Sequence, residues 1–271
     1  MKNEKFLIVG YGNMGQRYHR LLKEICHNCE VYVKTRDNGF KEFGVDRFDA
    51  AFICTPSDLH LRSAIDVLKN FGPTPMLIEK PVTNRCDESD EISYLIDYSI
   101  EHSIAIYIAY NLRHSSAMKE ISSALCDYRG PLRPTAVCRT NSDLWPGKRK
   151  LDSASVELSH EVDYLLYLFG QAKNVIDIVT LDEKRALVRI QHGNGILSNA
   201  YLDMRSPVEE RYLSLHPHNY NSGIFHITKE DIDFSYYSQI HYFMKNLNSP
   251  FINNNISEAI LVSDEEPEDE E

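Results

Sequence analysis

The sequence predicts an α/β protein: an N-terminal doubly wound parallel sheet, followed by an α+β domain with an open, mostly antiparallel sheet. Short, wholly apolar runs in the first third are typical of strands buried on both faces, and helical patterns alternate with them. Closely spaced strand-like segments in the second half favour antiparallel pairing. We expect domains at residues 1–112 and 113–262, and an acidic, disordered tail at 263–271.

Size and charge restrict the class of protein. The chain has 271 residues and 42% hydrophobic content, enough for two domains with real cores. Its net charge is −11, but seven acids lie in residues 263–271, so the body is only mildly acidic. It lacks a basic stripe for nucleic acid, an apolar run that could span a membrane, and a secretory leader. We therefore expect a cytoplasmic protein that binds neither nucleic acid nor membranes.

The six cysteines are expected to be reduced thiols, because no export signal accompanies them. Cys26 and Cys29 have the spacing of half a zinc site, but no second pair follows. We therefore expect no metal. A redox role for this pair is also disfavoured, since it falls between a helix and a strand and does not open a helix.

The segment GYGNMG follows an apolar run at residues 6–9 and precedes a helical pattern at 14–25. In the spacing G-x-G-x-x-G, the first glycine permits a tight turn, the second lets a pyrophosphate approach the backbone, and the third lets helix pack on strand. The N–H groups at the start of the helix face the anion. This order predicts a Rossmann domain that binds a dinucleotide, with a purely structural turn as the alternative. The residues of the expected loop are Gly10, Gly12, Asn13, Met14 and Gly15.

The end of the second strand, expected at residues 30–34, discriminates between NAD and NADP. An acid there accepts hydrogen bonds from the ribose 2′-hydroxyl of NAD. Here Lys34, Thr35 and Arg36 precede Asp37, and two cations and a hydroxyl suit the 2′-phosphate of NADP better. The sequence favours NADP, with NAD as the alternative if Asp37 reaches the ribose.

Lys80 follows an apolar strand at residues 76–78, in the tripeptide Glu79-Lys80-Pro81. Ligands of doubly wound sheets lie beyond the carboxyl ends of the strands. The proline stiffens the turn, so the ammonium group can point at a substrate oxygen near a nicotinamide. The alternative is an exposed lysine paired with Glu79.

Four motifs resemble the Gfo/Idh/MocA family (glucose-fructose oxidoreductase, inositol dehydrogenase, MocA) in order and spacing: VGYGNMGQRYHR, CTPSDLH at 54–60, IEKP at 78–81 and SVELSHEVDYLLYLFG at 155–170. The resemblance covers nearly the whole chain. It implies NAD(P)-dependent oxidation or reduction of a secondary alcohol or ketone on a sugar, cyclitol or sugar derivative. It also implies homodimers or homotetramers formed through the second sheet. Further cofactor contacts are implied at Thr55, Pro56, His60, Glu79 and Lys80.

The last motif predicts a helix with an apolar stripe on one face and His160 on another. His160 lies three residues after Glu157 and three before Asp163, and an imidazole between carboxylates is equipped for proton transfer. By resemblance His160 is the catalytic histidine, Lys80 the catalytic lysine, and Asp163 the acid that follows. Many family members have an aspartate where this chain has Val156, so Glu157 is expected to orient His160.

Together these features predict hydride transfer between a nicotinamide and a sugar or nucleotide-sugar substrate. His160 exchanges the hydroxyl proton, and Lys80 stabilises the developing oxyanion. Asn111 and Arg113 either contact substrate or cap the next helix. The segment at 144–156 lacks the usual glycine pair, which leaves a catalytically impaired dinucleotide-binding sensor or scaffold as the alternative. The expected substrate contacts are Lys80, Asn111, Arg113, Trp145 and His160.

Overall fold

The computed structural model describes residues 3–82, 89–126, 132–144, 157–215 and 223–248, which form two compact units. The first unit comprises the described residues up to Ala109 together with those from Gln239 onward. The second comprises the described part of Tyr110–Ser238. The first unit is therefore built from both ends of the described chain.

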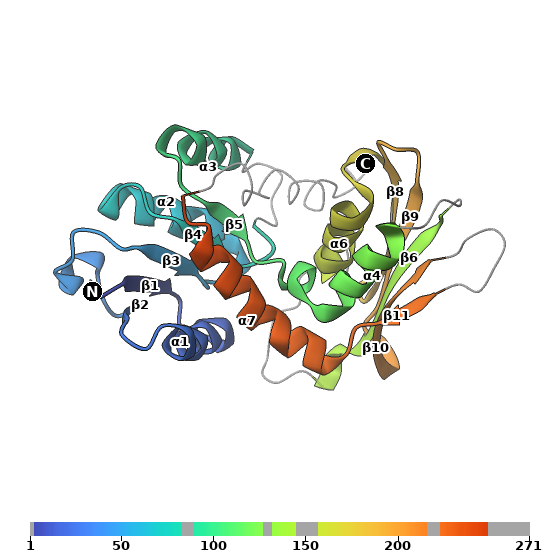
Figure 1. Ribbon diagram of the computed structural model, residues 1–271, viewed down its shortest axis with the longest axis horizontal. Helices are drawn as coiled ribbons and strands as arrows, with labels where there is room; N and C mark the ends of the chain where they lie inside the picture. The colour runs from blue at the N-terminus through green and yellow to red at the C-terminus, as the bar shows by residue number, and fades with distance from the viewer. Residues whose placement is uncertain (1–2, 83–88, 127–131, 145–156, 216–222, 249–271) are drawn as a thin grey trace, which may run out of the picture. The chain divides into compact units, whose positions relative to one another are not determined.

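A five-stranded sheet forms the centre of the first unit, with strand order β2-β1-β3-β4-β5 (Figure 1). All its pairings are parallel, as predicted. Every residue of the three strands β3, β4 and β5 is buried, which explains their apolar sequences. The strands are β1 (Lys5–Val9), β2 (Glu30–Lys34), β3 (Ala50–Ile53), β4 (Met76–Ile78) and β5 (Ile106–Ile108).

Helices cover both faces of this sheet. Helix α1 (Asn13–Ile25) and the end of α7 (Lys229–Lys245) share one face, because Tyr18 and Phe243 both pack on Phe52, with ring centroids 5.5 and 5.8 Å away. Helices α2 (His60–Phe71) and α3 (Ser89–His102) lie on the other face (Figure 1). The short helix η1 (Phe40–Phe43) lies between β2 and β3, and η2 (Ser57–Leu59) leads from β3 into α2.

The expected boundaries placed residues 113–262 in one domain, whereas the end of α7 belongs to the first unit. Besides the contact of Phe243, the Ala105 N–H donates to the Leu247 carbonyl at 2.9 Å. These contacts with the first sheet bring the end of α7 into the first unit.

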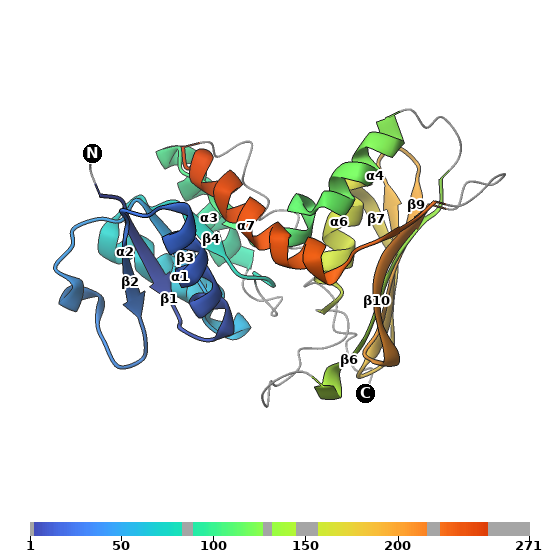
Figure 2. The same cartoon turned by 60° about the horizontal axis from the view of Figure 1, so that its bottom comes forward.

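The second unit contains a six-stranded sheet with the order β11-β10-β6-β9-β8-β7. Among the described pairings of this second sheet, only β6–β9 is parallel, so the prediction of a mostly antiparallel sheet is confirmed. Helices α4 (Ser116–Cys126) and α6 (Ser159–Phe169) lie on one face of it (Figure 2). The strands are β6 (Pro134–Asn141), β7 (Ala172–Asp182), β8 (Arg185–His192), β9 (Leu197–Asp203), β10 (Arg205–Leu215) and β11 (Ile224–His226).

Helix α6 packs on this sheet through the predicted apolar stripe. Val162, Leu165, Leu166 and Phe169 are all buried, and Gly170 ends the helix with a positive φ of 88°. Short helices η4 (Asn111–His114) and η5 (Ser142–Leu144) complete the unit. In the described part of the chain, no helix is long and apolar enough to cross a membrane.

Candidate active site

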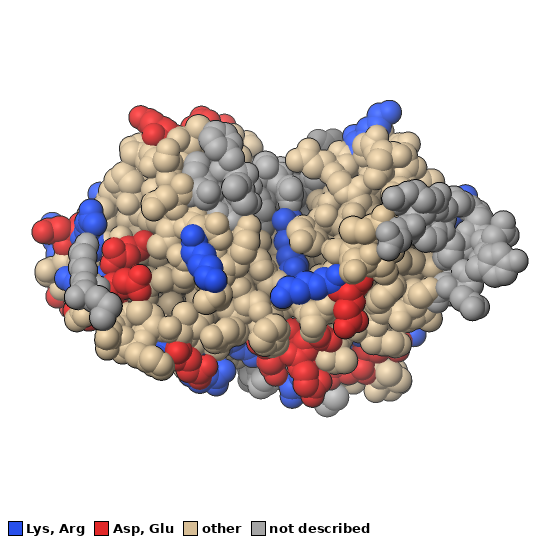
Figure 3. Space-filling view, in the orientation of Figure 1, with Lys and Arg blue, Asp and Glu red and all other residues tan. Residues whose placement is uncertain are grey.

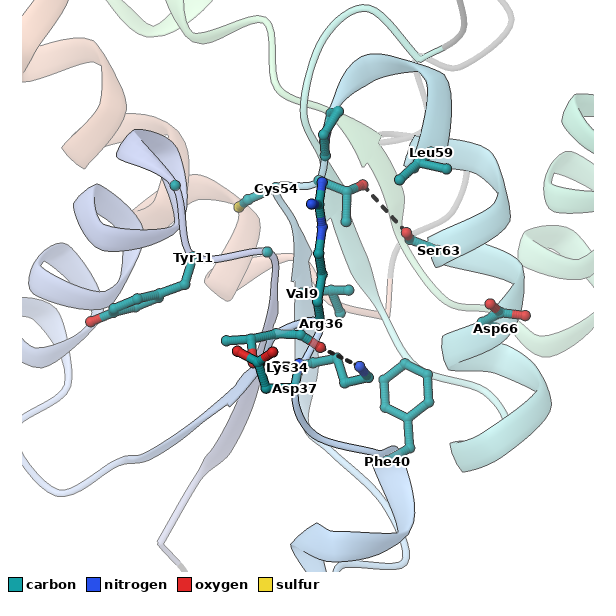
Figure 4. Close-up of a pocket in the computed structure, with 15 residues that line it drawn as sticks. Val9, Tyr11, Lys34, Arg36, Asp37, Phe40, Cys54, Leu59, Ser63 and Asp66 are labelled. Atoms are coloured by element: carbon teal, nitrogen blue, oxygen red, sulfur yellow. Dashed lines mark hydrogen bonds between the residues drawn. The ribbon is translucent and has the colours of Figure 1, made fainter. Parts of the chain in front are cut away.

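A cavity of about 730 Å³ opens at the carboxyl ends of β1, β2 and β3 (Figure 4). Ligands of doubly wound sheets bind at this edge, and the volume suits a cofactor. The loops after all three strands contribute to the lining. The predicted cofactor residues that line it are Gly10, Gly12, Lys34, Thr35, Arg36, Thr55 and Pro56.

The three glycines have distinct structural roles. Gly10 has a φ of +92°, and a Cβ there would lie 2.5 Å from the Cys54 carbonyl oxygen. A Cβ on Gly15 would collide with the Gly10 carbonyl, so this position lets helix α1 pack against the strand. A Cβ on Gly12 would meet nothing within 4 Å, yet Gly12 lines the cavity. The open space at Gly12 is where a ligand can approach the backbone.

Helix α1 begins at Asn13 with Gly12 as its N-cap. Its first turn contains no acidic residue, and Gly12 makes no side-chain cap. The first N–H groups of a helix lack partners within the helix and carry a partial positive charge. This end of the cavity therefore suits an anion. Asn13 and Met14 belong to this turn but are not among the residues that line the cavity.

The loop after β2 brings charged side chains into the cavity and is fixed by its own hydrogen bonds. The Thr35 N–H donates to Asn38 Oδ1 at 2.8 Å, and Asn38 Nδ2 donates to the Val33 carbonyl at 2.9 Å. The Lys34 ammonium donates to the Thr35 carbonyl and lies 5.6 Å from the centre of the Phe40 ring. Figure 4 shows Arg36 extended along the middle of the cavity.

Helix α2 supplies lining residues that the sequence analysis missed. Leu59, Ser63 and Asp66 line the cavity, and Ser63 Oγ donates to Thr55 Oγ1 at 3.3 Å (Figure 4). Leu59, which precedes the helix, lies four positions before Ser63, and Ser63 lies three positions before Asp66. This spacing puts the three side chains on one face of a helix. This spacing was the available signal.

The Glu79-Lys80-Pro81 loop follows β4 and is held in place by hydrogen bonds to Glu79. The Glu79 N–H donates to the Ile53 carbonyl at 2.9 Å, and the Tyr18 hydroxyl of α1 donates to the Glu79 carboxylate. Burial raises the pKa of Glu79, although Tyr18 and Lys80 act in the opposite direction. Lys80 is half-buried, and neither it nor Glu79 is among the residues that line the cavity.

His60 was expected to contact the cofactor but is buried, with 2% of its surface exposed, and is not among the cavity-lining residues. Its ring nitrogens contact two backbone carbonyls instead. Nδ1 lies 2.6 Å from the Pro81 oxygen, and Nε2 lies 2.8 Å from the Thr55 oxygen. His60 thus joins the loops that follow β3 and β4.

In the second unit, the segment Tyr110-Asn111-Leu112-Arg113 holds α6 and α7. The Tyr110 ring meets the His160 ring edge to face, with centroids 6.1 Å apart. Asn111 Nδ2 donates to Ser235 Oγ at 2.6 Å. Arg113 binds both carboxylate oxygens of Asp163, with Nε 2.8 Å from Oδ2 and Nη2 2.5 Å from Oδ1.

These contacts change the interpretation of two predicted substrate residues and one predicted acid. The side chains of Arg113 and Asp163 are 10% and 2% exposed, so the two residues form a nearly buried ion pair. Asn111 is 1% exposed. At the start of α4, the hydroxyl of Ser115 accepts the Met118 N–H at 3.2 Å, which is the contact of an N-cap. The described contacts of Asn111 and Arg113 hold α6 and α7.

A second buried ion pair, missed in the sequence, fixes α6 to the sheet. Arg211 Nε of β10 lies 2.9 Å from Glu161 Oε1, and Arg211 Nη2 donates to Cys138 Sγ at 3.3 Å. Burial acts to lower the pKa of Arg211, but Cys138 and Glu161 hold it well above its usual range. Burial also raises the pKa of Tyr164 on the same helix.

Glu157 is buried at the start of the α6 segment, and His160 is partly exposed. Trp145, the remainder of the 144–156 segment and the acidic tail lie outside the described residues. Among the residues that are described, no three His, Cys, Asp or Glu side chains gather as a metal site would require. The Cys26 thiol donates to Glu4 Oε2 at 2.9 Å, and burial raises its pKa to about 12.

No protein-family model matches the chain, and no curated protein sequence matches it. Solved structures do match over almost the full length. UDP-N-acetylglucosamine 3-dehydrogenase GnnA from Acidithiobacillus ferrooxidans is 17% identical with a TM-score of 0.73, and the match covers 97% of both chains. Myo-inositol 2-dehydrogenase from Lactobacillus plantarum is 13% identical with a TM-score of 0.76, covering 97% of this chain and 94% of that one.

A third structure is the WlbA dehydrogenase from Bordetella pertussis in complex with NADH and UDP-GlcNAcA. It is 16% identical with a TM-score of 0.71, and the match covers 97% of this chain and 94% of that one. The chain has the fold of Gfo/Idh/MocA-type dehydrogenases. The predicted architecture, a parallel sheet followed by a separate, mostly antiparallel sheet, is therefore confirmed.

Proposed function

We propose that the protein is an NAD(P)-dependent oxidoreductase that transfers a hydride between the nicotinamide and a secondary alcohol or ketone of a sugar or nucleotide sugar. The observation that carries this proposal is the cavity beside Gly12. It combines a backbone open to a ligand, a helix N-terminus without an acid in its first turn, and a volume of about 730 Å³. These features fit a dinucleotide with a pyrophosphate.

The residues that would hold the dinucleotide come from three loops. The pyrophosphate would bind at Gly10, Gly12 and the start of α1. Thr55 and Pro56 line the part of the cavity that follows β3. When bound, the nicotinamide supplies the hydride chemistry. The loop after β2 would contact the adenosine ribose.

NADP is the preferred cofactor in this proposal. Lys34 and Arg36 line the cavity at the end of β2, and cations at this position would favour a 2′-phosphate on the adenosine ribose. Asp37 and Asp66 line the same cavity, so the preference depends on how the cations and acids balance. Arg36 is the stronger candidate, since it extends along the cavity while Lys34 is bonded to the Thr35 carbonyl (Figure 4).

The proposed chemistry divides between two side chains. Lys80, at the carboxyl end of β4, holds the reacting oxygen and stabilises negative charge on it. His160 exchanges the hydroxyl proton, with Glu157 as its orienting acid. Asp163 and Arg113 act together as positioning residues for α6, because each neutralises the other.

The substrate class rests on the similar structures. By their names, GnnA acts on UDP-N-acetylglucosamine, and the Lactobacillus enzyme acts on myo-inositol. The WlbA structure contains a UDP-linked sugar acid. A ring carrying secondary hydroxyl groups is common to all three, and we extend that class to this chain.

We further propose a homodimer or homotetramer formed through the face of the second sheet that lies opposite helices α4 and α6 (Figure 2). The strand register aligns an apolar and aromatic row across five strands of that face: Val179, Leu187, Tyr201, Val137 and Tyr212. Ion pairs Arg189–Asp177 and Arg139–Glu210, at 2.9 and 2.6 Å, lie on either side of this row. An apolar centre with a charged rim is typical of a protein interface.

Cytoplasmic location and the lack of nucleic-acid or membrane partners remain part of the proposal. On the face drawn in Figure 3, Lys and Arg side chains are scattered among Asp and Glu and form no continuous basic stripe. A phosphate backbone requires such a stripe. The mild charge of the chain body supports the same conclusion.

The test of the proposed function is a turnover assay with UDP-sugars and inositols, in which oxidation or reduction of the nicotinamide is followed by absorbance. The wild-type chain should turn over at least one of these compounds with NADP or NAD. Lys80→Met should lose turnover while its dinucleotide affinity stays within about twofold. Dinucleotide binding without any turnover by the wild type would point to the sensor or scaffold, and unchanged turnover in Lys80→Met would remove Lys80 from the mechanism.

A further inference from the structure

His60 is the first residue of α2, and its ring bridges the two loops that carry the candidate site. Its Nε2 contacts the carbonyl oxygen of Thr55, which follows β3 and lines the cavity. Its Nδ1 contacts the carbonyl oxygen of Pro81, the residue after Lys80. One buried side chain therefore connects the cofactor cavity to the lysine loop.

The chemistry of the two contacts restricts the state of the ring. Carbonyl oxygens only accept hydrogen bonds, whereas a neutral imidazole has one N–H and one nitrogen that accepts. A neutral ring would thus place a lone pair against one of the carbonyls. The doubly protonated ring donates to both, and the distances of 2.6 and 2.8 Å fit two charge-assisted bonds.

A second buried histidine provides an internal comparison. His192 in the second unit is 0% exposed, with Nδ1 2.6 Å from the Gly170 oxygen and Nε2 2.7 Å from Ser198 Oγ. A hydroxyl donates as well as accepts, so the neutral ring satisfies both of these contacts. Burial also lowers the pKa of His192. The two carbonyl partners of His60 therefore call for a doubly protonated ring, whereas the partners of His192 are satisfied by the neutral one.

We propose that His60 is a positioning residue: a two-donor clamp that holds the carbonyls of Thr55 and Pro81 and so fixes Lys80 relative to the dinucleotide cavity. The importance of Lys80 rests on the proposed function, whereas the clamp itself does not. Among the described residues of the two segments that His60 joins, the other ionisable side chains are Cys54, Asp58, Glu79 and Lys80, and the Glu79 carboxylate accepts a hydrogen bond from Tyr18.

The first test is the protonation of the ring, measured by ¹⁵N–¹H NMR on the full chain labelled at its histidines. His60→Phe identifies the His60 signals by their loss, and His192→Phe does the same for the control. His60→Gln serves if the Phe variant does not accumulate. We expect two protonated nitrogens on His60 and one on His192 near neutral pH. A single protonated nitrogen on His60 would overturn the two-donor clamp.

The second test is amide hydrogen exchange of residues 76–82, which include the Glu79 N–H bonded to the Ile53 carbonyl. Loss of both bonds in His60→Phe should accelerate exchange in this loop at least about fivefold, as expected for a net hydrogen-bond contribution near the typical value. His60→Gln, with fewer donors to offer, should give a smaller acceleration. His192→Phe should leave the loop unchanged. Equal exchange in wild type and His60→Phe would contradict the clamp.

Neither readout needs substrate or cofactor. A wild-type protein with a doubly protonated His60 that binds no dinucleotide would therefore refute the proposed function and leave the clamp in place. If the protein does turn over a sugar, His60→Phe should lower kcat at least about tenfold, because Lys80 loses its orientation. His192→Phe should keep kcat, and equal kcat values in the two variants would argue against a positioning role.

Discussion

The three glycines give a sharp prediction, because they separate ligand binding from folding. Gly12→Ala adds a methyl group that meets no protein atom within 4 Å and projects from the cavity lining. Gly12 has φ −74° and ψ −161°, a conformation that alanine adopts without strain. Gly15→Ala places the same methyl group against the Gly10 carbonyl, where backbone has to shift.

The magnitudes follow from these contacts. Overpacking at Gly15 should cost about 1–3 kcal/mol, and at about 2–4 °C per kcal/mol Tm should fall by about 2–12 °C. Gly12→Ala replaces an N-cap glycine by alanine, which costs about 1 kcal/mol or less. It should nevertheless weaken dinucleotide binding more than about tenfold, since hydrogen bonds to a charged phosphate contribute about 1.5–3 kcal/mol.

Two measurements test this pair of variants. Thermal unfolding without ligand should place Gly12→Ala close to wild type and Gly15→Ala below it. Fluorescence titration with NADPH should show loss of affinity in Gly12→Ala even though the protein is folded. Wild-type affinity in Gly12→Ala would refute the assignment of the open space at this glycine to the pyrophosphate.

Three further predictions concern charged groups. In fluorescence titrations, Arg36→Ala should weaken NADPH binding about tenfold and leave NADH binding within about twofold of wild type. An equal loss for both dinucleotides would mean that Arg36 does not recognise the 2′-phosphate. Asp163→Leu should lower the free energy of unfolding by about 3 kcal/mol or more, because it leaves Arg113 charged and nearly buried. Adding Arg113→Leu should recover part of that loss, as measured by denaturant titration. No recovery in the double variant would mean that the two side chains are not coupled. Burial raises the pKa of Glu79 above 4.5, so ionisation of this carboxyl in the folded state lowers stability as pH rises past that value. Glu79→Gln should therefore raise Tm near neutral pH and lose this advantage near pH 4. The opposite trend would contradict a raised pKa.

Features that depend on short stretches of sequence could be predicted. Strands β2 and β4 lie at the predicted residues. Strand β4 is buried along its whole length, and a strand buried on both faces needs a continuous apolar run. The glycine loop and the end of α6 at Gly170 followed from local backbone requirements. The cofactor cavity was foreseeable for the same reason, since the loops after successive parallel strands meet at one edge.

Other elements have weak local signals. Helix α3 was not predicted: only Ile92, Leu95 and Ser99 are buried along its length, so its apolar stripe is narrow. Strand β6 begins with a proline and has only three hydrophobic residues, Ala136, Val137 and Cys138, yet it lies between β9 and β10 in the second sheet. The register of neighbouring strands, and not its own pattern, determines its place.

The polar contacts that hold the site connect residues far apart in the chain. Arg113 and Asp163 are 50 positions apart, and the His60 ring contacts Pro81 across 21. Sequence spacing placed Asp163 on the helix of His160 but could not reveal that Arg113 neutralises it. The same limit applied to Arg211 and Glu161, which meet only because α6 packs on the sheet that contains β10.

The central claim is that the cavity beside Gly12 binds a nicotinamide dinucleotide, and a side-by-side fluorescence titration of the full chain with NADPH and NADH tests it most directly. The account predicts saturable binding of at least one, with NADPH bound more tightly, and loss of that binding in Gly12→Ala. Failure of the folded wild-type chain to bind either one would contradict the claim, and the proposed oxidoreductase activity would fall with it.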